Sequence, residues 1–370
     1  MLLLFVSFFY LLFFIWLANG FQKSKKDSSE EFPLVSIIVA ARNEEKNINQ
    51  FISSLINQNY PKEKFEIIIA NDKSSDNTYQ ILDLLKNKIS SLKVINIQNT
   101  PNNWGSKKWA LNLAINESKY DIILQTDADC IVDSEWIKNM SIQFNNPDIG
   151  FVAGHTPFIQ KSNHILNKIL AFENFSQDAF IGACINRDIP LSCVGRSIGF
   201  RKKYFFDSNG YNDFKNEISG DDDLLMHRIL HQKKSKVQYV NIKNSFVYTN
   251  PPQNLMQFIN QRLRYASKGK LYFSAFFISS ELRIILPFLF LTNLFYIISL
   301  LLLCNTPKMI YLFPIIFKMA GDFIVTFSFS KIIQSRFSFH LFCLSSLIHP
   351  FYVVIFSLLG PFIKFDWKKN

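Results

Sequence analysis

Two aspartates one residue apart follow an apolar run in the stretch LQTDADC, residues 124–130. Asp127 and Asp129 cannot both be buried without partners, because an isolated ionised carboxylate in an apolar setting costs several kcal/mol or more. A hard divalent cation resolves this conflict, since it takes oxygen ligands and brings its own partner phosphates. The spacing therefore predicts a metal site that serves a phosphate-bearing ligand.

The elements that position these acids are predicted by alternating patterns. Short, β-branched, nearly continuous apolar runs, typical of strands covered on both faces, occupy residues 34–40, 65–70, 92–97 and 120–126. Helical spacing separates them, at residues 44–57, 76–88 and 106–116. Such alternation predicts an α/β domain with right-handed parallel βαβ units.

Polar residues follow three of these predicted strands. ARNEE (41–45) follows the first, Asp72 follows the second, and Asp127 and Asp129 follow the fourth. Ligands of open α/β sheets bind at the carboxyl ends of the strands. We therefore expect acids and amides from three strand ends to meet in one crevice.

The apolar residues outside this region predict membrane segments. Residues 1–19 carry no charged side chain, and three further apolar runs lie at 284–304, 309–330 and 341–363. Residues 33–270 have an ordinary mixed-charge composition. We expect a transmembrane helix at 1–20, a soluble domain at 33–270 and a membrane region of about three helices at 284–363. A cleaved signal peptide at the N-terminus is the alternative.

Charge and cysteine content narrow the class of protein. The formal net charge is +11, but many basic residues flank membrane segments, among them Lys23, Lys25 and Lys26. Basic residues there favour the cytoplasmic face and anionic headgroups, so we expect a membrane partner and no nucleic acid. The five cysteines lack metal-ligand spacing, so a reducing compartment without structural zinc is the default expectation.

Six stretches in this order resemble one known family. They are VSIIVAARNEE (35–45), ANDKSSDNT (70–78), SKKWAL (106–111), TDADC (126–130), SGDDDLLMHR (219–228) and QRLRY (261–265). In order and spacing they resemble the nucleotide loop, second-strand aspartate, lysine motif, DxD motif, acidic motif and QxxRW motif of family 2 glycosyltransferases. The resemblance implies the GT-A fold, a Rossmann-like mixed sheet.

The same resemblance implies inverting transfer of a sugar from a nucleotide-diphosphate donor, a UDP-sugar first, with Mg²⁺ or Mn²⁺. A cation can stabilise the charge that builds as the diphosphate leaves, and Lys107 can add a positive charge near the phosphates. A solvated lysine at a helix start is the alternative for Lys107. The implied nucleotide-sugar-binding residues are Ala40, Arg42, Glu44, Asp72, Lys107 and Asp127, and the implied metal ligands are Asp127 and Asp129.

Inversion in one displacement needs a base opposite the leaving group. Aligning the family's acidic motif on Arg228 puts this base at Asp222, whereas aligning it on the leucine puts it at Asp221. We prefer Asp222, since the middle member of an acidic triplet feels two like charges. An acid-rich helix start, favoured by the helix dipole, is the alternative.

The acceptor side departs from the family pattern. QRLRY ends in Tyr265 instead of Trp, and in CVGRSIGFRK (193–202) Ser197 replaces the family's Asn while Arg201 remains. The implied acceptor-binding residues are Gln261, Arg264, Tyr265 and Arg201.

We expect a lipid or lipid-linked saccharide acceptor, because one N-terminal and three C-terminal spans are few for a polysaccharide channel. A processive polysaccharide synthase subunit is the alternative. A membrane-anchored nucleotidyltransferase is less favoured, because AARNEE lacks the glycine that a phosphate loop needs.

Two further expectations concern the membrane. Since nucleotide sugars are cytosolic, the domain at 33–270 should lie on the cytoplasmic side of the cell membrane. Four spans would then leave the basic C-terminus outside, so the segment 341–363, with its His349-Pro350 break, is a candidate re-entrant segment. Within the apolar run 309–330, Lys318 and Asp322 are four residues apart, and we expect them to pair.

Overall fold

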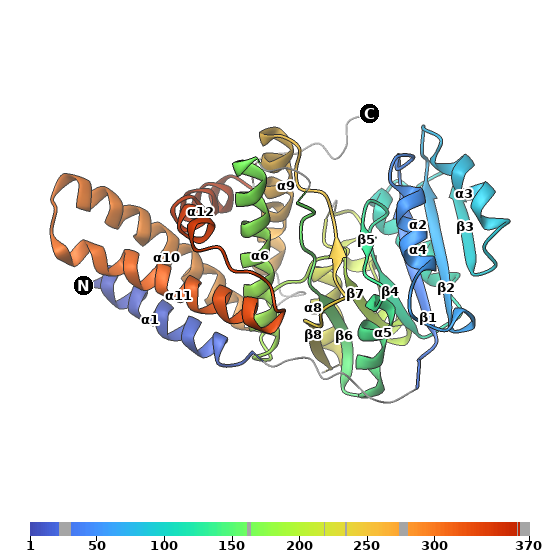
Figure 1. Ribbon diagram of the computed structural model, residues 1–370, viewed down its shortest axis with the longest axis horizontal. Helices are drawn as coiled ribbons and strands as arrows, with labels where there is room; N and C mark the ends of the chain where they lie inside the picture. The colour runs from blue at the N-terminus through green and yellow to red at the C-terminus, as the bar shows by residue number, and fades with distance from the viewer. Residues whose placement is uncertain are drawn as a thin grey trace. The chain divides into compact units, whose positions relative to one another are not determined.

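The computed structural model describes residues 1–21, 31–160, 164–217, 219–233, 235–273, 280–360 and 362. Two compact units divide the chain (Figure 1). The sheet unit comprises 23–159 and 192–250, and the helical unit comprises 1–22, 160–191 and 251–370. Two helices inside the predicted span 33–270, α6 (Ile165–Ile185) and α9 (Leu255–Ser267), thus group with the apolar helices.

The sheet unit contains a mixed seven-stranded sheet in the order β3-β2-β1-β4-β7-β6-β8. Its strands are β1 (Val35–Ala41), β2 (Phe65–Asp72), β3 (Leu92–Ile97), β4 (Ile122–Gln125), β6 (Ile149–Gly154), β7 (Ile198–Arg201) and β8 (Lys236–Val240). The four predicted strands are confirmed and pair in parallel, and β7 is antiparallel to both of its neighbours. A separate pair joins β5 (Ile131–Val132) to β9 (Val247–Tyr248).

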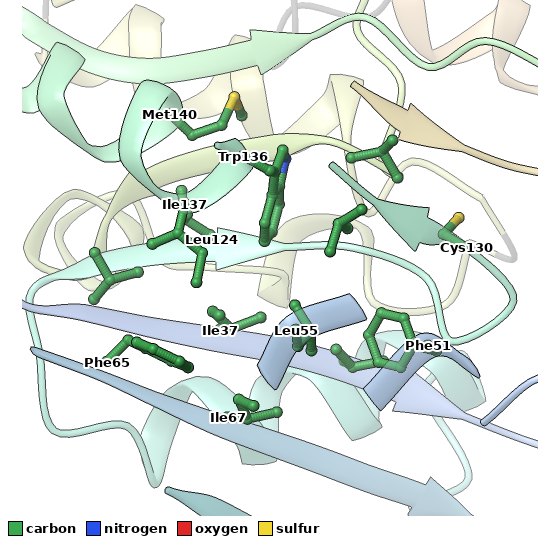
Figure 2. Packing of buried hydrophobic residues seen from close by; sticks show 14 of the residues in the cluster. Ile37, Phe51, Leu55, Phe65, Ile67, Leu124, Cys130, Trp136, Ile137 and Met140 are labelled. Carbon is green, nitrogen blue, oxygen red and sulfur yellow. The ribbon is translucent and has the colours of Figure 1, made fainter. Parts of the chain in front are cut away.

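Helices cover both faces of the parallel half of the sheet. Alternate residues such as Ile37 and Ile67 pack with Phe51 of α2 (Ile48–Ile56) and Trp136 of α5 (Trp136–Ser141), as Figure 2 shows. Residues on the other face, such as Ile38, are equally buried. This two-sided burial explains why the strands are nearly continuous apolar runs. The remaining helices of the unit are α3 (Thr78–Lys86), α4 (Ser106–Asn116), α7 (Lys202–Asp207) and α8 (Asp223–Lys233), with 3₁₀ turns at 62–64, 142–145 and 212–214.

Among the residues that the structure describes, the helical unit contains three helices long and apolar enough to cross a membrane, at Glu281–Asn305, Met309–Ile332 and Phe339–Leu359. They correspond to α10 (Ser280–Asn305), α11 (Leu312–Ile332) and α12 (Phe339–Leu359), and they match the three predicted runs. A shorter apolar helix, α1 (Leu2–Ala18), packs along α11. Short 3₁₀ turns at 268–273 and 309–311 complete the unit.

The predicted break in the last apolar segment is not seen, because α12 continues as a helix through Pro350. The predicted membrane orientation depends on basic residues near both ends of the chain. These residues, Lys23, Lys25 and Lys26 and the basic residues of 364–370, lie outside the described residues.

Candidate active site

The predicted acidic pair lies at the carboxyl edge of β4. The strand ends at Gln125, and Asp127 and Asp129 follow it with partly exposed side chains. Asp127 Oδ1 lies 3.0 Å from Lys107 Nζ, and Cys130 Sγ lies 3.7 Å from Asp129 Oδ1. Burial and the nearby carboxylates, Asp129 before Asp127, raise the pKa of the Cys130 thiol, so this thiol is neutral.

Lys107 joins the acidic pair to the second acidic stretch. Its Nζ is also 2.8 Å from Asp221 Oδ2, so one ammonium lies between two carboxylates that are far apart in the sequence. The Lys107 side chain is 24% exposed and that of Asp221 is 11% exposed. The solvated-lysine alternative is therefore wrong for Lys107.

The electrostatics of this cluster favour a cation. Burial alone would lower the pKa of Lys107, but Asp127 and Asp221 outweigh it and raise the pKa above its ordinary value. Lys107 is therefore a permanent positive charge. Together with Asp129, the carboxylates still exceed the ammonium in charge, so the edge retains an excess of negative charge that a divalent cation can offset.

Asp221 and Asp222 have different surroundings at the start of α8. Asp221 Oδ2 accepts a hydrogen bond from Gln125 Nε2 at 3.2 Å in addition to its contact with Lys107. Asp222 instead accepts main-chain N–H groups on both oxygens, from Gly195 at 3.0 Å and from Asp223 at 2.8 Å. Asp222 thus links the segment at Gly195 to the start of α8, whereas Asp221 faces the charged cluster.

Residues at the start of α4 contact the loop that precedes Asp221 and Asp222. Gly105 N donates to Lys215 O at 2.6 Å, and a Cβ at Gly105 would lie 2.9 Å from Glu217 O, so the close approach requires glycine. Lys108, which is 1% exposed, donates to the carbonyl oxygens of Glu217 and Ser219, the latter at 2.8 Å. The two consecutive lysines therefore have separate roles, since Lys107 contacts the acids and Lys108 supports their loop.

The residues expected to bind the nucleotide lie at the same edge. Ala40 and Arg42 are at the end of β1, and Asp72 is the last residue of β2. Asp72 is buried, accepts a hydrogen bond from Ser106 Oγ, and lies 3.6 Å from Lys73 Nζ. Because Ser106 directly precedes Lys107 at the start of α4, this helix N-terminus lies among three strand ends, where its dipole favours an anion such as a diphosphate.

Glu44 is also buried in this region. Its Oε2 accepts a hydrogen bond from Asn47 Nδ2 at 2.8 Å, and its main-chain N–H donates to Thr78 Oγ1 at 2.7 Å. The bond to Thr78 joins the loop after β1 to the start of α3, and the bond from Asn47 joins it to the start of α2.

Arg201, expected on the acceptor side, is not brought to this edge. Register pairs Gln125 with Ile198 but Ile122 with Arg201, which places Arg201 beside the opposite end of β4. The Arg201 guanidinium donates to the carbonyl oxygens of Phe144 at 2.7 Å, Ile149 at 3.1 Å and Asn146 at 3.2 Å. The other expected acceptor residues, Gln261, Arg264 and Tyr265, lie on α9 in the helical unit.

Two contributors were missed by sequence reasoning, Gln125 and Lys108. Gln125 is a fully buried polar residue within an apolar strand, and that exception to the pattern is the signal that identifies it. Lys108 has no comparable signal, because nothing in its sequence context distinguishes it from a solvated lysine.

The donor set fits magnesium or manganese. No cluster of three or more His, Cys, Asp or Glu side chains suited to a metal occurs in the described ranges. Asp127 and Asp129 supply two carboxylates, and Mg²⁺ in proteins is commonly held by one or two carboxylates together with substrate phosphates and waters. The site therefore suits a cation that arrives with a phosphorylated ligand.

Residues 36–206 match the sequence model of the family described as Glycosyl transferase family 2. A probable glycosyltransferase, YdaM, from Bacillus subtilis (strain 168) is 32% identical over 149 residues, 40% of this chain and 35% of that relative. A poly-beta-1,6-N-acetyl-D-glucosamine synthase from Staphylococcus aureus (strain COL) is 30% identical over 246 residues, 65% of this chain and 55% of that relative. The chain thus spans about a third to a half of these relatives.

Among solved structures, the mannosyltransferase PcManGT from Pyrobaculum calidifontis, in complex with GDP-Man and Mn²⁺, superimposes with a TM-score of 0.57 at 14% identity. The superposition covers 97% of this chain and 99% of that one. At this identity the likeness shows the fold.

Proposed function

We propose that the protein transfers a sugar, with inversion, from a nucleotide-diphosphate sugar to a membrane-associated acceptor. The match of residues 36–206 to the sequence model of family 2 glycosyltransferases supports this proposal, and the likeness to PcManGT supports the fold. The acceptor in this proposal is a lipid or a lipid-linked saccharide. The observation that carries the proposal is the position of Lys107 between Asp127 and Asp221, because it joins a phosphate-binding feature to a candidate base.

In this proposal the nucleotide sugar binds at the carboxyl ends of β1, β2 and β4. Asp72 and Glu44 would receive the base and ribose, with Ala40 and Arg42 beside them, and the start of α4 with Lys107 would receive the diphosphate. Asp127 and Asp129 would hold Mg²⁺ or Mn²⁺, which when bound stabilises negative charge on the leaving diphosphate. A UDP-sugar is the proposed donor, by analogy with the family's uracil-binding aspartate at the position of Asp72.

The acceptor half of the reaction needs a base. We assign this role to Asp221, whose carboxylate faces the charged cluster while both oxygens of Asp222 accept main-chain N–H groups. The acceptor hydroxyl would give its proton to Asp221 as its oxygen bonds to the anomeric carbon. The bond from that carbon to the diphosphate oxygen would break, and the nucleoside diphosphate would leave with the electron pair.

Membrane attachment of the reaction is supported by the three apolar helices of the helical unit. Because nucleotide sugars are cytosolic, we place the sheet unit on the cytoplasmic side of the cell membrane. A second candidate, a processive polysaccharide synthase subunit, is favoured by the similarity to the staphylococcal poly-N-acetylglucosamine synthase. Product length separates the two, since a single transfer yields one product and a processive enzyme yields a long ladder.

The test is release of nucleoside diphosphate by the purified full chain from UDP-N-acetylglucosamine, UDP-glucose and GDP-mannose, each with Mg²⁺, with Mn²⁺ and with a chelator. We expect metal-dependent release from at least one UDP-sugar, and loss of that release in Asp127→Asn. Lys93→Met is the matched control, because Lys93 is an exposed lysine on β3 whose ion pair with Glu117 lies outside the cluster. Release that is equal with chelator, or equal in Asp127→Asn, would exclude the proposed mechanism.

A further inference from the structure

The helical unit contains a cavity of about 280 Å³ between its helices. Its wall is formed by residues of α1, α6, α9, α10, α11 and α12. Phe14, Phe180 and Phe342 supply aromatic surface, and Asn293 and Asp322 supply polar groups. Polar groups among helices apolar enough to cross a membrane are costly, so they indicate a function.

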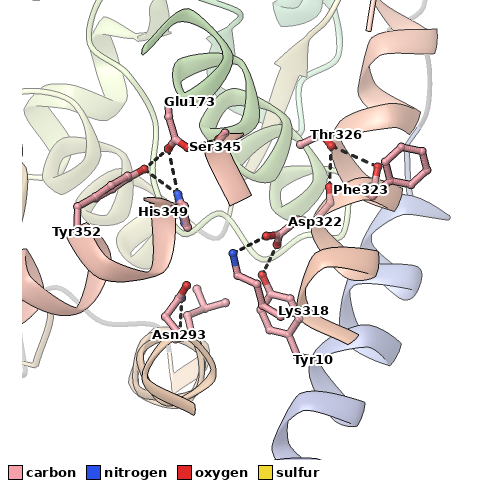
Figure 3. Close-up of polar contacts among 11 residues, drawn as sticks. Tyr10, Glu173, Asn293, Lys318, Asp322, Phe323, Thr326, Ser345, His349 and Tyr352 are labelled. Atoms are coloured by element: carbon pink, nitrogen blue, oxygen red, sulfur yellow. Dashed lines mark hydrogen bonds and ion pairs between the residues drawn. The ribbon is translucent and has the colours of Figure 1, made fainter. Parts of the chain in front are cut away.

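One polar cluster is centred on Glu173 of α6, as Figure 3 shows. Glu173 is buried and contacts three side chains of α12, Ser345, His349 and Tyr352, with His349 Nδ1 at 3.0 Å from Glu173 Oε2. All three of these α12 residues line the cavity. The cluster therefore fixes the orientation of one polar wall.

A second cluster is centred on Asp322 of α11. Lys318 Nζ lies 2.6 Å from Asp322 Oδ2, which confirms the predicted pair, and the Tyr10 hydroxyl donates to Asp322 Oδ1 at 2.5 Å. Asp322 and Tyr10 line the cavity, and Lys318, which is 1% exposed, contacts Asp322 (Figure 3). The charge of Asp322 is thus neutralised by Lys318, while Asp322 itself forms part of the wall.

Two groups on the wall have hydrogen-bonding capacity that the described residues do not fill. Asn293 is 4% exposed, and its Nδ2 donates to Leu289 O at 2.8 Å, but its Oδ1 accepts no hydrogen bond from any residue in the described ranges. Arg262 Nε is likewise buried without an acceptor there, although its Nη1 donates to Gln177 Oε1 at 3.2 Å. Buried polar groups of this kind are normally paired, so an acceptor and a donor are available to a ligand.

From these observations we propose that the cavity binds one neutral sugar ring. The cavity wall and its two clusters hold two cations, Arg262 and Lys318, and two carboxylates, Asp322 and Glu173. With His349 neutral these charges balance, so the site has no excess positive charge suited to a free phosphate. A ring hydroxyl can donate to Asn293 Oδ1 and another can accept from Arg262 Nε. The aromatic surface suits the apolar faces of a sugar, in keeping with pockets that combine apolar walls and a few polar groups.

The volume supports a single ring. A cavity of about 280 Å³ lies just below the range of about 300–1,000 Å³ that is usual for drug-sized ligands, so it suits a ligand of about one ring. The proposed sugar-binding site is formed by residues of the helical unit. Only the identification of this sugar as part of the saccharide acceptor rests on the proposed function.

The test uses the full chain, purified in a detergent without a sugar headgroup, and saturation-transfer NMR titrations with the methyl β-glycosides of N-acetylglucosamine, glucose and mannose. UDP and Mg²⁺ are kept saturating so that the donor site is filled. We expect binding of at least one glycoside. Asn293→Leu should weaken it by about 2–10-fold, the effect of one hydrogen bond.

Asn305→Leu is the matched control. Asn305 lies on the same helix and also donates from Nδ2 to a carbonyl four residues earlier, that of Leu301, but its side chain is exposed. Asn305→Leu should leave glycoside binding unchanged. Should Asn293→Leu lower the melting temperature, Asn293→Ala removes the same amide without added bulk and should show the same loss of binding.

Three results would overturn the proposal. They are absence of binding to all three glycosides, equal binding in the Asn293 variants and the parent, and displacement of the glycoside by inorganic pyrophosphate. Asp127→Asn, measured in parallel, should keep glycoside binding while losing metal-dependent donor turnover. In the parent protein, failure of turnover with retained glycoside binding would refute the proposed function alone, and turnover without glycoside binding would refute the sugar site alone.

Discussion

Replacing Asp221 by Asn should lower the rate of sugar transfer by about 10²–10⁴-fold, the usual contribution of a general base. This corresponds to about 3–5 kcal/mol of transition-state stabilisation at about 1.4 kcal/mol per factor of ten. Metal binding should change little, because the proposed metal ligands are Asp127 and Asp129.

The same substitution should scarcely affect stability. The amide introduced by Asp221→Asn would keep an oxygen that can accept from Gln125 Nε2, and Lys107 would keep its contact with Asp127 at 3.0 Å. The lost ion pair is largely buried, but Lys107 keeps Asp127 as a charged partner and the new amide is neutral, so no unpaired buried charge is left. We therefore expect a melting temperature close to that of the parent.

Asp222→Asn should show the opposite signature. Asp222 accepts the main-chain N–H of Gly195 on one oxygen and that of Asp223 on the other, and an amide can accept only one of the two. Leaving a largely buried N–H group unpaired costs about 1–3 kcal/mol. The melting temperature should fall by several degrees, at roughly 2–4 °C per kcal/mol for a domain of this size.

The assay combines transfer kinetics, titration of UDP in the presence of Mg²⁺, and thermal unfolding of both variants. The reasoning fails if Asp222→Asn abolishes transfer at an unchanged melting temperature while Asp221→Asn transfers at the parent rate. That result would restore the alignment on Arg228 and make Asp222 the base.

Three other outcomes are expected. Asp129→Asn should abolish transfer and weaken metal-dependent donor binding together, measured by nucleotide titration with and without Mg²⁺; full activity with unchanged metal dependence would remove Asp129 from the metal site. Lys108→Met should lower the free energy of unfolding by about 1–3 kcal/mol, because the carbonyl groups of Glu217 and Ser219 lose their donor. Lys119→Met, at an exposed lysine, should leave the free energy of unfolding unchanged, and equal melting temperatures for the two variants would contradict this. A single cysteine introduced at exposed Glu63 of the sheet unit should resist an impermeant thiol reagent in intact cells and react after lysis, and labelling of intact cells would refute the cytoplasmic placement.

The strands and the donor edge could be predicted from the sequence because they follow from local patterns. A strand buried on both faces must be nearly continuous in apolar character, and the buried residues Ile37, Ile67 and Leu124 belong to such runs. Parallel strands joined by helices place their carboxyl ends at one edge, so Asp72 and Asp127 had to lie near each other. The order of the quoted stretches carried the resemblance to the family for the same reason, since it follows this succession of strand ends.

Tertiary structure decided the roles of neighbouring residues with the same chemistry. Asp221 and Asp222 are adjacent residues of the same type, and so are Lys107 and Lys108. Asp221 and Lys107 contact each other in the charged cluster, whereas Asp222 and Lys108 bind main-chain groups. The direction of a side chain at a strand or helix end has no periodicity that a sequence displays. It depends on which distant segment packs there, as Gly195 does against Asp222.

The helical unit shows the same division between local and distant causes. Hydropathy and length predicted α10, α11 and α12, because each is an apolar run long enough to cross a bilayer. The spacing of four residues determined the Lys318–Asp322 pair, since such residues lie on one helix face. In contrast, the association of Glu173 with Ser345, His349 and Tyr352 depends on α6 packing against α12, and only the folded chain brings those two helices together.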